Sequence, residues 1–322
     1  MALLKRQCFM LLSAVSAIIS VAAFSTKVFS TEASPVALEG VQQQMNILQA
    51  IFLGFVQGMT EFLPISSSAH LKVVPVALGW GDPGVAFTAI IQLGSIVAVL
   101  WYFWDDMTQI FQGAIKAIAV KDYENHNLQL FLGIALGTMP IIVFGLLIKR
   151  FIPDYDNSPL RSLTAIAIAS IFMSLLLGLA EKLGKRQRDF QHLTLKDGLW
   201  MGFAQCLALI PGVSRSGSTI TGGLFMSLKR ETAARFSFLL GIPAITLAGL
   251  VELKDFLDVG VGNIGMLPMV VGTISSGIFS YIAIAGLIQF LKTQSTWVFI
   301  WYRLAFGIAI LGAISTGLLK NN

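Results

Sequence analysis

The residues best suited to chemistry in this chain lie in two short polar stretches, and the second of them has the composition of a phosphate-binding loop. Residues 211–219 have the sequence PGVSRSGST, with Arg215 at the centre. A guanidinium presents a planar fork that binds two phosphate oxygens and offsets the charge that develops during phosphoryl transfer. Hydroxyl groups flank it, and glycines let the backbone approach a ligand closely. We predict that Arg215 is catalytic and that the phosphate is also bound by Ser214, Ser216, Gly217 and Thr219.

The first polar stretch carries groups that suit acid–base and nucleophilic chemistry. Residues 57–70 have the sequence QGMTEFLPISSSAH. If the part before the proline is helical, Gln57 and Glu61 lie four residues apart on one face. A serine is a poor nucleophile without a neighbouring base, so we predict Ser67 as the nucleophile and Glu61 or His70 as its base. Direct attack by a water molecule that Glu61 or His70 activates is the alternative. The predicted phosphate-binding set is completed by Gln57, Ser66 and Ser68.

Each of these groups also has a purely structural interpretation. Glu61 could pair with an arginine only to lock two helices together, and Arg215 could extend to lipid headgroups. The hydroxyls of residues 66–68 could cap the following helix, whose positive dipole end would also attract an anion. His70 would then sit one turn into that helix and donate to a carbonyl. The sequence leaves these alternatives open.

The elements that position the two stretches belong to a membrane protein. Hydrophobic residues make up 55% of the 322 residues and charged residues 12%, with a mean hydropathy of +0.77, which excludes an ordinary soluble globule. Apolar runs of spanning length recur at about 86–104, 130–149, 161–180, 233–251, 268–291 and 297–318. The net charge of +5 comes from Lys and Arg residues that cluster in short segments between these runs. They are typical of orientation signals, so we predict a lipid bilayer and no nucleic acid as partner.

The remaining features concern topology and metal sites. The basic segment 181–196 is predicted to be cytoplasmic, and the acidic 252–264 loop suits the other face. Residues 1–45 form an N-terminal extension that has the pattern of either a signal peptide or an extra anchor helix. Two cysteines and three histidines support neither a disulfide framework nor a thiolate or histidine metal cage.

The two polar stretches belong to an internal repeat. Residues 54–68 align with 202–216 at a constant offset of 148, with five identities in fifteen positions, and a weaker echo pairs Gly137-Thr138 with Gly272-Thr273. Each copy begins with a short apolar segment, at about 46–63 and 197–210, that breaks at a proline before the serines. Interrupted segments at matching places in two halves are typical of broken or re-entrant helices that meet at a binding site.

We therefore predict an all-α polytopic membrane protein with two inverted repeats, whose broken or re-entrant helices meet at a central polar site. The two Ser-rich loops are expected to line one cavity there. The repeat halves cover about 46–150 and 196–318, within a single membrane-embedded domain at 46–318.

The chain resembles a known family, the undecaprenyl-diphosphate phosphatases once named bacitracin-resistance proteins. The resemblance rests on QGMTEFLPISSSAH and PGVSRSGST in that order and separation, and apolar patterning extends it over about 46–318. It implies a phosphatase of the bacterial plasma (inner) membrane with two interlocked inverted repeats. Such an enzyme converts undecaprenyl diphosphate, a C55 polyprenyl diphosphate lipid, to the monophosphate, so that the carrier is recycled for peptidoglycan synthesis. A homodimer is the candidate assembly.

The sequence departs from many members of that family at one position. Gln57 stands where many carry Glu, and an amide is neither a base nor an anionic metal ligand, so a carboxylate role falls to Glu61 alone. A divalent cation, Mg²⁺ or Ca²⁺, could bridge Glu61 and the diphosphate. A transporter or flippase of a phosphorylated lipid or small anion is the alternative function, because the same Arg and hydroxyls could bind phosphate without cleaving it.

Overall fold

The described part of the chain is helical. The computed structural model describes residues 45–321 except 153–154, 156–157 and 260–264. These residues form α-helices, short 3-10 turns and one isolated bridge between Arg188 and Leu228, which agrees with the predicted all-α class. The prediction for the N-terminal extension lies outside the described residues apart from Met45.

Five described helices are long and apolar enough to cross a membrane, and a bent pair raises the number to six if it forms one span. The bent pair consists of α4 and α5, which meet at an angle of 61°. The chain is therefore a multi-pass membrane protein. The bounds are α4 Val85–Tyr102, α5 Trp104–Ala119, α6 His126–Phe151, α7 Leu163–Leu183, α10 Arg230–Val259, α11 Met266–Leu291 and α12 Trp297–Ser315.

Two sequence predictions need correction at helix ends. The apolar run predicted at about 86–104 is not one continuous helix, because the chain bends after Tyr102 and a second helix, α5, begins there. Asp105 and Asp106 lie in the first turn of α5, where the helix dipole favours carboxylates. The acidic segment 252–264 is not all loop, since α10 continues to Val259. Its residues before Gly260 include neither glycine nor proline, so nothing in that stretch breaks the helix.

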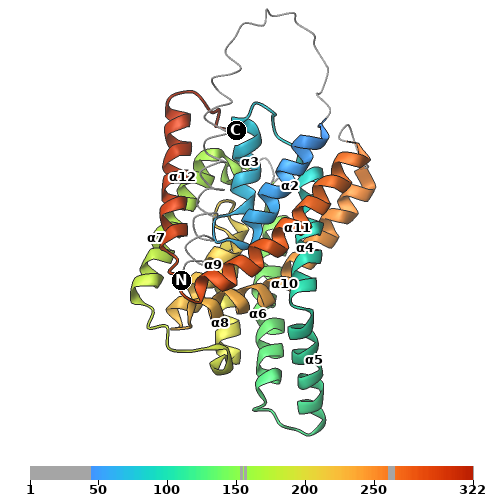
Figure 1. Ribbon diagram of the computed structural model, residues 1–322, viewed down its shortest axis with the longest axis vertical. Coiled ribbons are helices and arrows are strands. Elements are labelled where there is room, and N and C mark those ends of the chain that lie inside the picture. Colours follow the sequence, from blue (N-terminus) through green and yellow to red (C-terminus); the bar gives the residue numbers. More distant parts are fainter. Residues whose placement is uncertain (1–44, 153–154, 156–157, 260–264, 322) are drawn as a thin grey trace, which may run out of the picture.

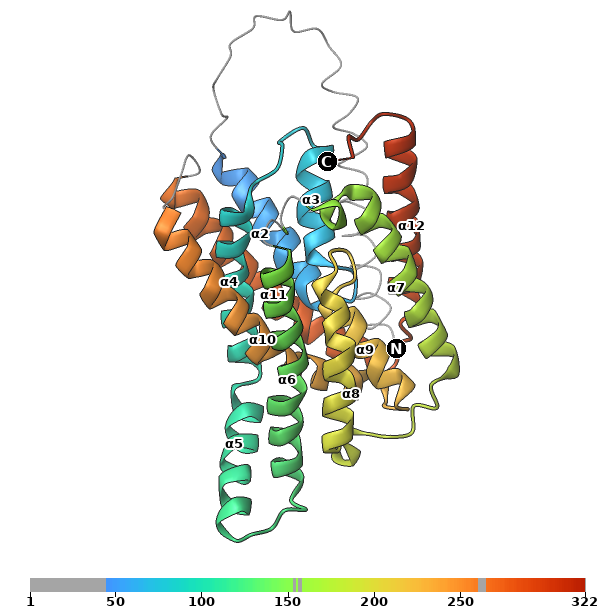
Figure 2. The ribbon, with the colours of Figure 1, turned by 180° about the vertical axis from the view of Figure 1, so that it is seen from behind.

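The two interrupted segments form matching helix–turn–helix units. In the first copy α2 (Ile47–Phe62) leads into α3 (Ser67–Ala77), and in the second α8 (Leu195–Gln205), extended by the 3-10 turn η4 (Cys206–Leu209), leads into α9 (Arg215–Phe225). The bounds of α3 and α9 differ by 148 residues, the same offset as in the sequence alignment. With 16 residues α2 is only about 24 Å long, too short to span the bilayer comfortably. Figures 1 and 2 show both turns in the middle of the molecule.

Glycine contacts hold each unit against a helix from the other half. A Cβ atom at Gly54 on α2 would collide with the carbonyl of Gly272 on α11, and one at Gly202 on α8 would collide with the carbonyl of Gly137 on α6. Only glycine permits this approach of helix backbones. Gly54 and Gly202 correspond in the repeat, and their partners are the glycines of the weaker sequence echo. The two halves are therefore interlocked through equivalent contacts.

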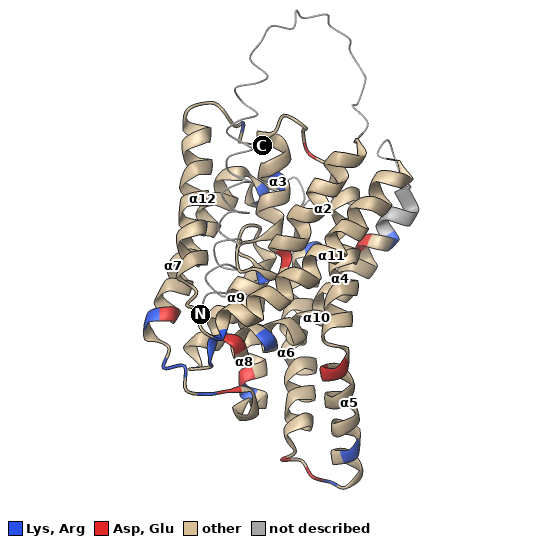
Figure 3. Cartoon of the chain, viewed as in Figure 1, with Lys and Arg blue, Asp and Glu red and all other residues tan. Residues whose placement is uncertain are grey.

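Charged residues gather at one end of the molecule, near α8 and the segment that precedes it (Figure 3). The carboxylate of Glu181, at the end of α7, pairs with Arg186 and Arg230 and accepts a hydrogen bond from Thr296 at 2.8 Å. Arg188 binds Asp197 through two hydrogen bonds of 2.6 and 2.7 Å, and these bonds raise the pKa of the guanidinium. Arg230 thus joins α10 to α7, Thr296 links the start of α12 to the same carboxylate, and Arg188 holds α8 against the segment that precedes it.

Candidate active site

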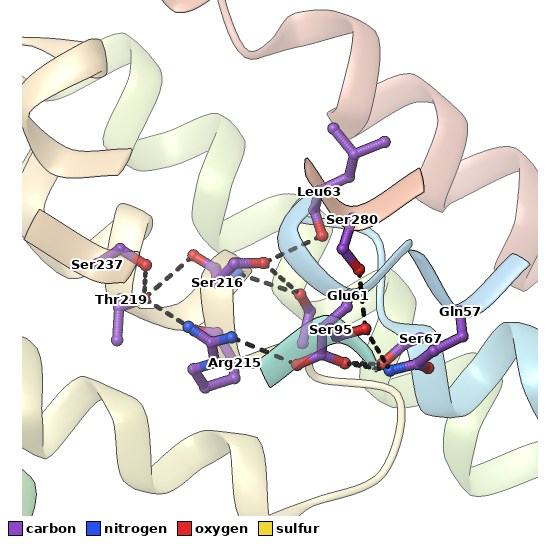
Figure 4. Close-up of polar contacts among 12 residues, drawn as sticks. Gln57, Glu61, Leu63, Ser67, Ser95, Arg215, Ser216, Thr219, Ser237 and Ser280 are labelled. Carbon is purple, nitrogen blue, oxygen red and sulfur yellow. Dashed lines mark hydrogen bonds and ion pairs between the residues drawn. The ribbon is translucent and has the colours of Figure 1, made fainter. Parts of the chain in front are cut away.

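The turns of the two repeat units touch each other, as predicted for a central site. The Ser216 hydroxyl, at the start of α9, donates to the Leu63 carbonyl at the end of α2 over 3.0 Å. The Arg215 Nη2 lies 3.3 Å from Glu61 Oε1. Figure 4 shows that the side chains around these contacts come from α2, α3, α4, α9, α10 and α11. Residues about 150 positions apart in the sequence therefore form one polar centre.

Glu61 is the acceptor at the middle of this centre. Its Oε2 accepts hydrogen bonds from Ser67 Oγ at 2.7 Å and from Gln57 Nε2 at 3.2 Å, while Oε1 faces Arg215. The side chain is 9% exposed. A hydroxyl within hydrogen-bond reach of a carboxylate is the arrangement needed for a nucleophile and its base. Gln57 also donates to Ser95 Oγ at 3.4 Å, which links the site to α4.

Arg215 has donors to spare. Among the described residues its Nε and Nη1 are buried and have no hydrogen-bond partner. The guanidinium carbon lies 5.7 Å from the ring centroid of Phe62, and a Cβ at Gly241 on α10 would collide with Nη1. Buried donors without partners are unfavourable, so an acceptor that reaches them would be bound strongly. Each of these N–H groups can donate to a phosphate oxygen.

The serine that begins each second helix has an unusual backbone conformation. Ser66 has a φ of 76° and Ser214 a φ of 73°. In both turns the hydroxyl of this serine contacts the hydroxyl of the serine two residues later, at 3.1 and 3.2 Å. Ser214 Oγ accepts from Gly217 N at 3.1 Å and so caps α9. Ser66 occupies the corresponding position but makes no side-chain cap bond. The predicted serine cap is therefore wrong for Ser66, because its hydroxyl contacts Ser68 instead.

His70 lies beside the site with partners of its own. It is 2% exposed, its Nδ1 lies 2.7 Å from the Ser66 carbonyl, and its Nε2 lies 2.6 Å from the Tyr302 hydroxyl. These contacts match the structural interpretation, in which this histidine donates to a carbonyl. A base role for His70 remains a prediction, and the described geometry favours Glu61 as the base for Ser67.

Three of the residues predicted to bind phosphate lie against protein groups of the second turn and its neighbours. The Thr219 hydroxyl contacts the Arg215 carbonyl at 2.9 Å and the Ser237 hydroxyl at 2.5 Å. Ser216 bonds to the first turn, and the space beside Gly217 is filled by Arg303 Nη1. Their contacts shape the second turn, and direct phosphate binding by them stays a prediction. Ser68 differs from them because it is exposed.

Arg303 was not among the predicted site residues, although it contacts both turns. The side chain is fully buried on α12 and donates to the carbonyls of Pro64 at 3.0 Å, Gly212 at 2.8 Å and Val213 at 2.9 Å. The sequence did contain a signal, because an ionisable residue inside an apolar run is costly and marks a function or a partner. Ser95 was not among the predicted site residues either, and its hydroxyl lies 3.0 Å from that of Ser276 and 2.8 Å from that of Ser280.

The donor set gives limited support for a metal held by the protein. No cluster of three or more His, Cys, Asp or Glu side chains occurs within the described ranges. Glu61 is the carboxylate of the site, both of its oxygens accept hydrogen bonds, and a guanidinium lies against one of them. A hard cation needs several oxygen ligands. These residues alone do not form a cation site.

Comparison with known proteins gives a consistent result. The family model described as bacitracin resistance protein BacA matches residues 50–309. A protein named undecaprenyl-diphosphatase from Nostoc sp. is 73% identical over 322 residues, covering 100% of both chains. Proteins of the same name from Trichormus variabilis and Synechococcus elongatus are 74% and 66% identical, over 322 and 278 residues, which cover 100% and 86% of this chain and 100% and 96% of theirs.

Proposed function

This chain belongs to the bacitracin resistance protein BacA family, and we propose that it is an undecaprenyl-diphosphatase that hydrolyses undecaprenyl diphosphate to undecaprenyl phosphate and inorganic phosphate. The resemblance noted in the two motifs is thereby confirmed. The observation that carries the proposal is the Ser67–Glu61 hydrogen bond beside a guanidinium with two unpaired, buried donors. The product is the lipid carrier used in peptidoglycan synthesis, so its recycling accounts for bacitracin resistance.

The proposed reaction assigns one step to each group. Arg215 binds oxygens of the terminal phosphoryl group and offsets their charge. Ser67 Oγ attacks that phosphorus, its proton passes through Glu61 to the leaving undecaprenyl phosphate, and the phosphoanhydride bond breaks so that this product leaves with the bridging oxygen. Water then attacks the phosphoserine and gives a proton to Glu61, which passes it to Ser67 Oγ as phosphate is released and the serine is restored. In the alternative mechanism, a water activated by Glu61 attacks directly and no phosphoserine forms.

We further propose that the two repeats are inverted. In Figures 1 and 2, α2 and α8 approach the central turns from opposite ends of the molecule. The equivalent glycine contacts of the two halves support the same relation. The halves at 46–150 and 196–318 then place Glu61 and Arg215 on opposite sides of a pseudo-symmetric centre.

The remaining proposals concern location, cofactor and assembly. The plasma membrane of a bacterium is the proposed location, with the basic segment 181–196 in the cytoplasm. A divalent cation is proposed only as a companion of the substrate, with Glu61 contributing one ligand and diphosphate oxygens the others. Removal of divalent cations with EDTA, followed by addition of Mg²⁺ or Ca²⁺, tests this, and unchanged phosphate release in EDTA would contradict it. A homodimer remains a prediction.

The function is tested by phosphate release from C55 prenyl diphosphate with purified protein in detergent. Wild type is expected to release phosphate, and Arg215→Ala and Glu61→Gln should each lower kcat/KM at least about 10²-fold. Arg150→Ala, at an exposed position near the end of α6, is the matched control and should retain activity. If the folded wild type binds the lipid and releases nothing, the hydrolase proposal fails and a transporter of phosphorylated lipid takes its place.

A further inference from the structure

The strained turn that precedes Ser67 is held by a side chain of α3, the helix that follows it. Ser66 has a positive φ, which is unfavourable for a residue with a Cβ and persists only when the surroundings enforce it. Its side chain does not cap α3. Its carbonyl accepts instead from two atoms of His70, the backbone N at 3.3 Å and the ring Nδ1 at 2.7 Å. The His70 ring therefore adds a second, side-chain hydrogen bond to this carbonyl.

The hydrogen-bond partners determine which ring nitrogen carries the proton. A carbonyl oxygen can only accept, so Nδ1 of His70 must be the donor to Ser66. In a neutral ring Nε2 is then an acceptor, and the Tyr302 hydroxyl donates to it over 2.6 Å. The ring lies parallel to those of Tyr302 and Phe306, with interplanar angles of 9° and 5°. A positive charge on the ring would be unfavourable here, because the ring is buried and because the buried Arg303 interacts electrostatically with it.

We propose that Tyr302 is a positioning residue: through His70 it fixes the Ser66 carbonyl and thereby aims the Ser67 hydroxyl at Glu61. Ser67 follows Ser66 directly, and its Oγ lies 2.7 Å from Glu61 Oε2. A small displacement of a reacting group lowers the rate strongly. The proposal rests on the proposed function, and it gives His70 a tethering role in place of the base role predicted from the sequence.

The second copy holds the corresponding turn through different bonds. Ser214 has the same backbone conformation as Ser66, yet its own hydroxyl caps α9 through Gly217 N. The residue that corresponds to His70 is Ser218, whose hydroxyl bonds to the Arg215 carbonyl at 2.9 Å within α9. Two adjacent residues of α12 therefore hold the turns. Tyr302 contacts the first turn through His70, and Arg303 donates to backbone carbonyls of both turns.

The test compares Tyr302→Phe, which removes only the hydroxyl, with Tyr281→Phe, a 43% exposed tyrosine on α11. For Tyr302→Phe we expect kcat on C55 prenyl diphosphate to fall about ten- to a hundredfold, with KM and the pH profile nearly unchanged. His70→Asn keeps an N–H donor near the Ser66 carbonyl but cannot act as a base. It should retain much more activity than His70→Ala, and adding Tyr302→Phe to it should have little further effect.

A second measurement tests the hydrogen bond between Tyr302 and His70 without measuring catalytic turnover. Nitrogen-15 NMR of histidine-labelled protein, with only three histidines to assign, should show His70 as the neutral Nδ1–H form in wild type and Tyr281→Phe, and a mixed form in Tyr302→Phe. The proposal is overturned if Tyr302→Phe leaves kcat unchanged, if the ring is doubly protonated or carries its proton on Nε2, or if His70→Asn is as inactive as His70→Ala. Failure of wild type to release phosphate would instead overturn the proposed function, and the NMR result would still decide the tether.

Discussion

The two turns at the centre of the molecule have nearly the same backbone and carry different chemistry. Both contain a serine with positive φ, followed two residues later by a second serine whose hydroxyl touches the first. At the offset of 148, Arg215 occupies the position of Ser67, and Leu209 occupies that of Glu61. The two copies thus share one backbone conformation. The first copy carries the groups that accept and donate protons, while the second carries the positive charge that suits an anion.

The largest effect is expected from weakening the second turn. Arg215→Lys keeps the positive charge but removes the planar fork and its two unpaired donors. We expect kcat/KM for the C55 substrate to fall about 10³-fold, because a point charge cannot replace two directed hydrogen bonds to the phosphoryl group. Arg150→Lys is the matched control. Activity of Arg215→Lys within a few-fold of wild type would mean that charge alone is sufficient in this turn.

Removing the nucleophile tests the chemistry of the first turn. Ser67→Ala should lower kcat at least about 10²-fold and abolish any phosphoserine that can be trapped by acid quench with labelled substrate. Ser218→Ala, in the second copy, should have a much smaller effect because its hydroxyl bonds only to the Arg215 carbonyl in the structure. If Ser67→Ala stays active and wild type yields no phosphoserine, water is the nucleophile and the first turn supplies only the base.

Arg303 tests whether the two turns depend on one common support. Arg303→Met would leave buried carbonyls in both turns without a donor, which we expect to lower the free energy of unfolding by about 3 kcal/mol. Thermal unfolding in detergent measures this, with Arg235→Met as the control because that arginine is partly exposed and pairs with Asp106. A loss of activity below the unfolding temperature would show that the turns moved apart. Equal stability of both variants would contradict the role of Arg303 as a support.

The smallest expected effect separates the two strained serines. Glycine tolerates positive φ, so Ser66→Gly relieves strain and loses only a contact with Ser68, whereas Ser214→Gly also loses the cap of α9. We expect Ser214→Gly to be less stable than Ser66→Gly by about 1 kcal/mol. Chemical or thermal unfolding of the two variants side by side provides the comparison. The reverse order would mean that the Ser66 hydroxyl stabilises its turn more than the structure indicates.

The sequence predicted the class of fold, the spans and the approach of the two turns, because long apolar runs and a polar repeat can be recognised without knowing how the helices pack. It did not predict the bend after Tyr102 or the helical end of α10, since helix ends depend on neighbouring elements. Within the site, Glu61, Ser67 and Arg215 came together as expected. Gly241 was beyond sequence reasoning, because a glycine in an apolar segment signals nothing until the guanidinium that fills its space is located.

The partners of His70 could not be predicted for a similar reason. Tyr302 lies 232 residues away, in an apolar helix that the motifs do not include. Spacing along the chain suggested a base for Ser67, whereas the fold placed the ring against another helix. Proximity in sequence therefore identified the turn to which His70 belongs and its bond to a carbonyl, but it could not identify Tyr302 as the second partner.

The interlocked glycine contacts have a consequence for synthesis on the ribosome. The helix that packs on α2 is α11, and the arginine that holds both turns lies on α12, so both elements follow the first half in the sequence. The ribosome synthesises the first half before these partners, so Glu61 lacks its contacts with the second half until that half has been inserted. A nascent chain that stops after the first half cannot assemble the polar centre. Catalytic competence in this protein therefore arises only after α11 and α12 have been synthesised.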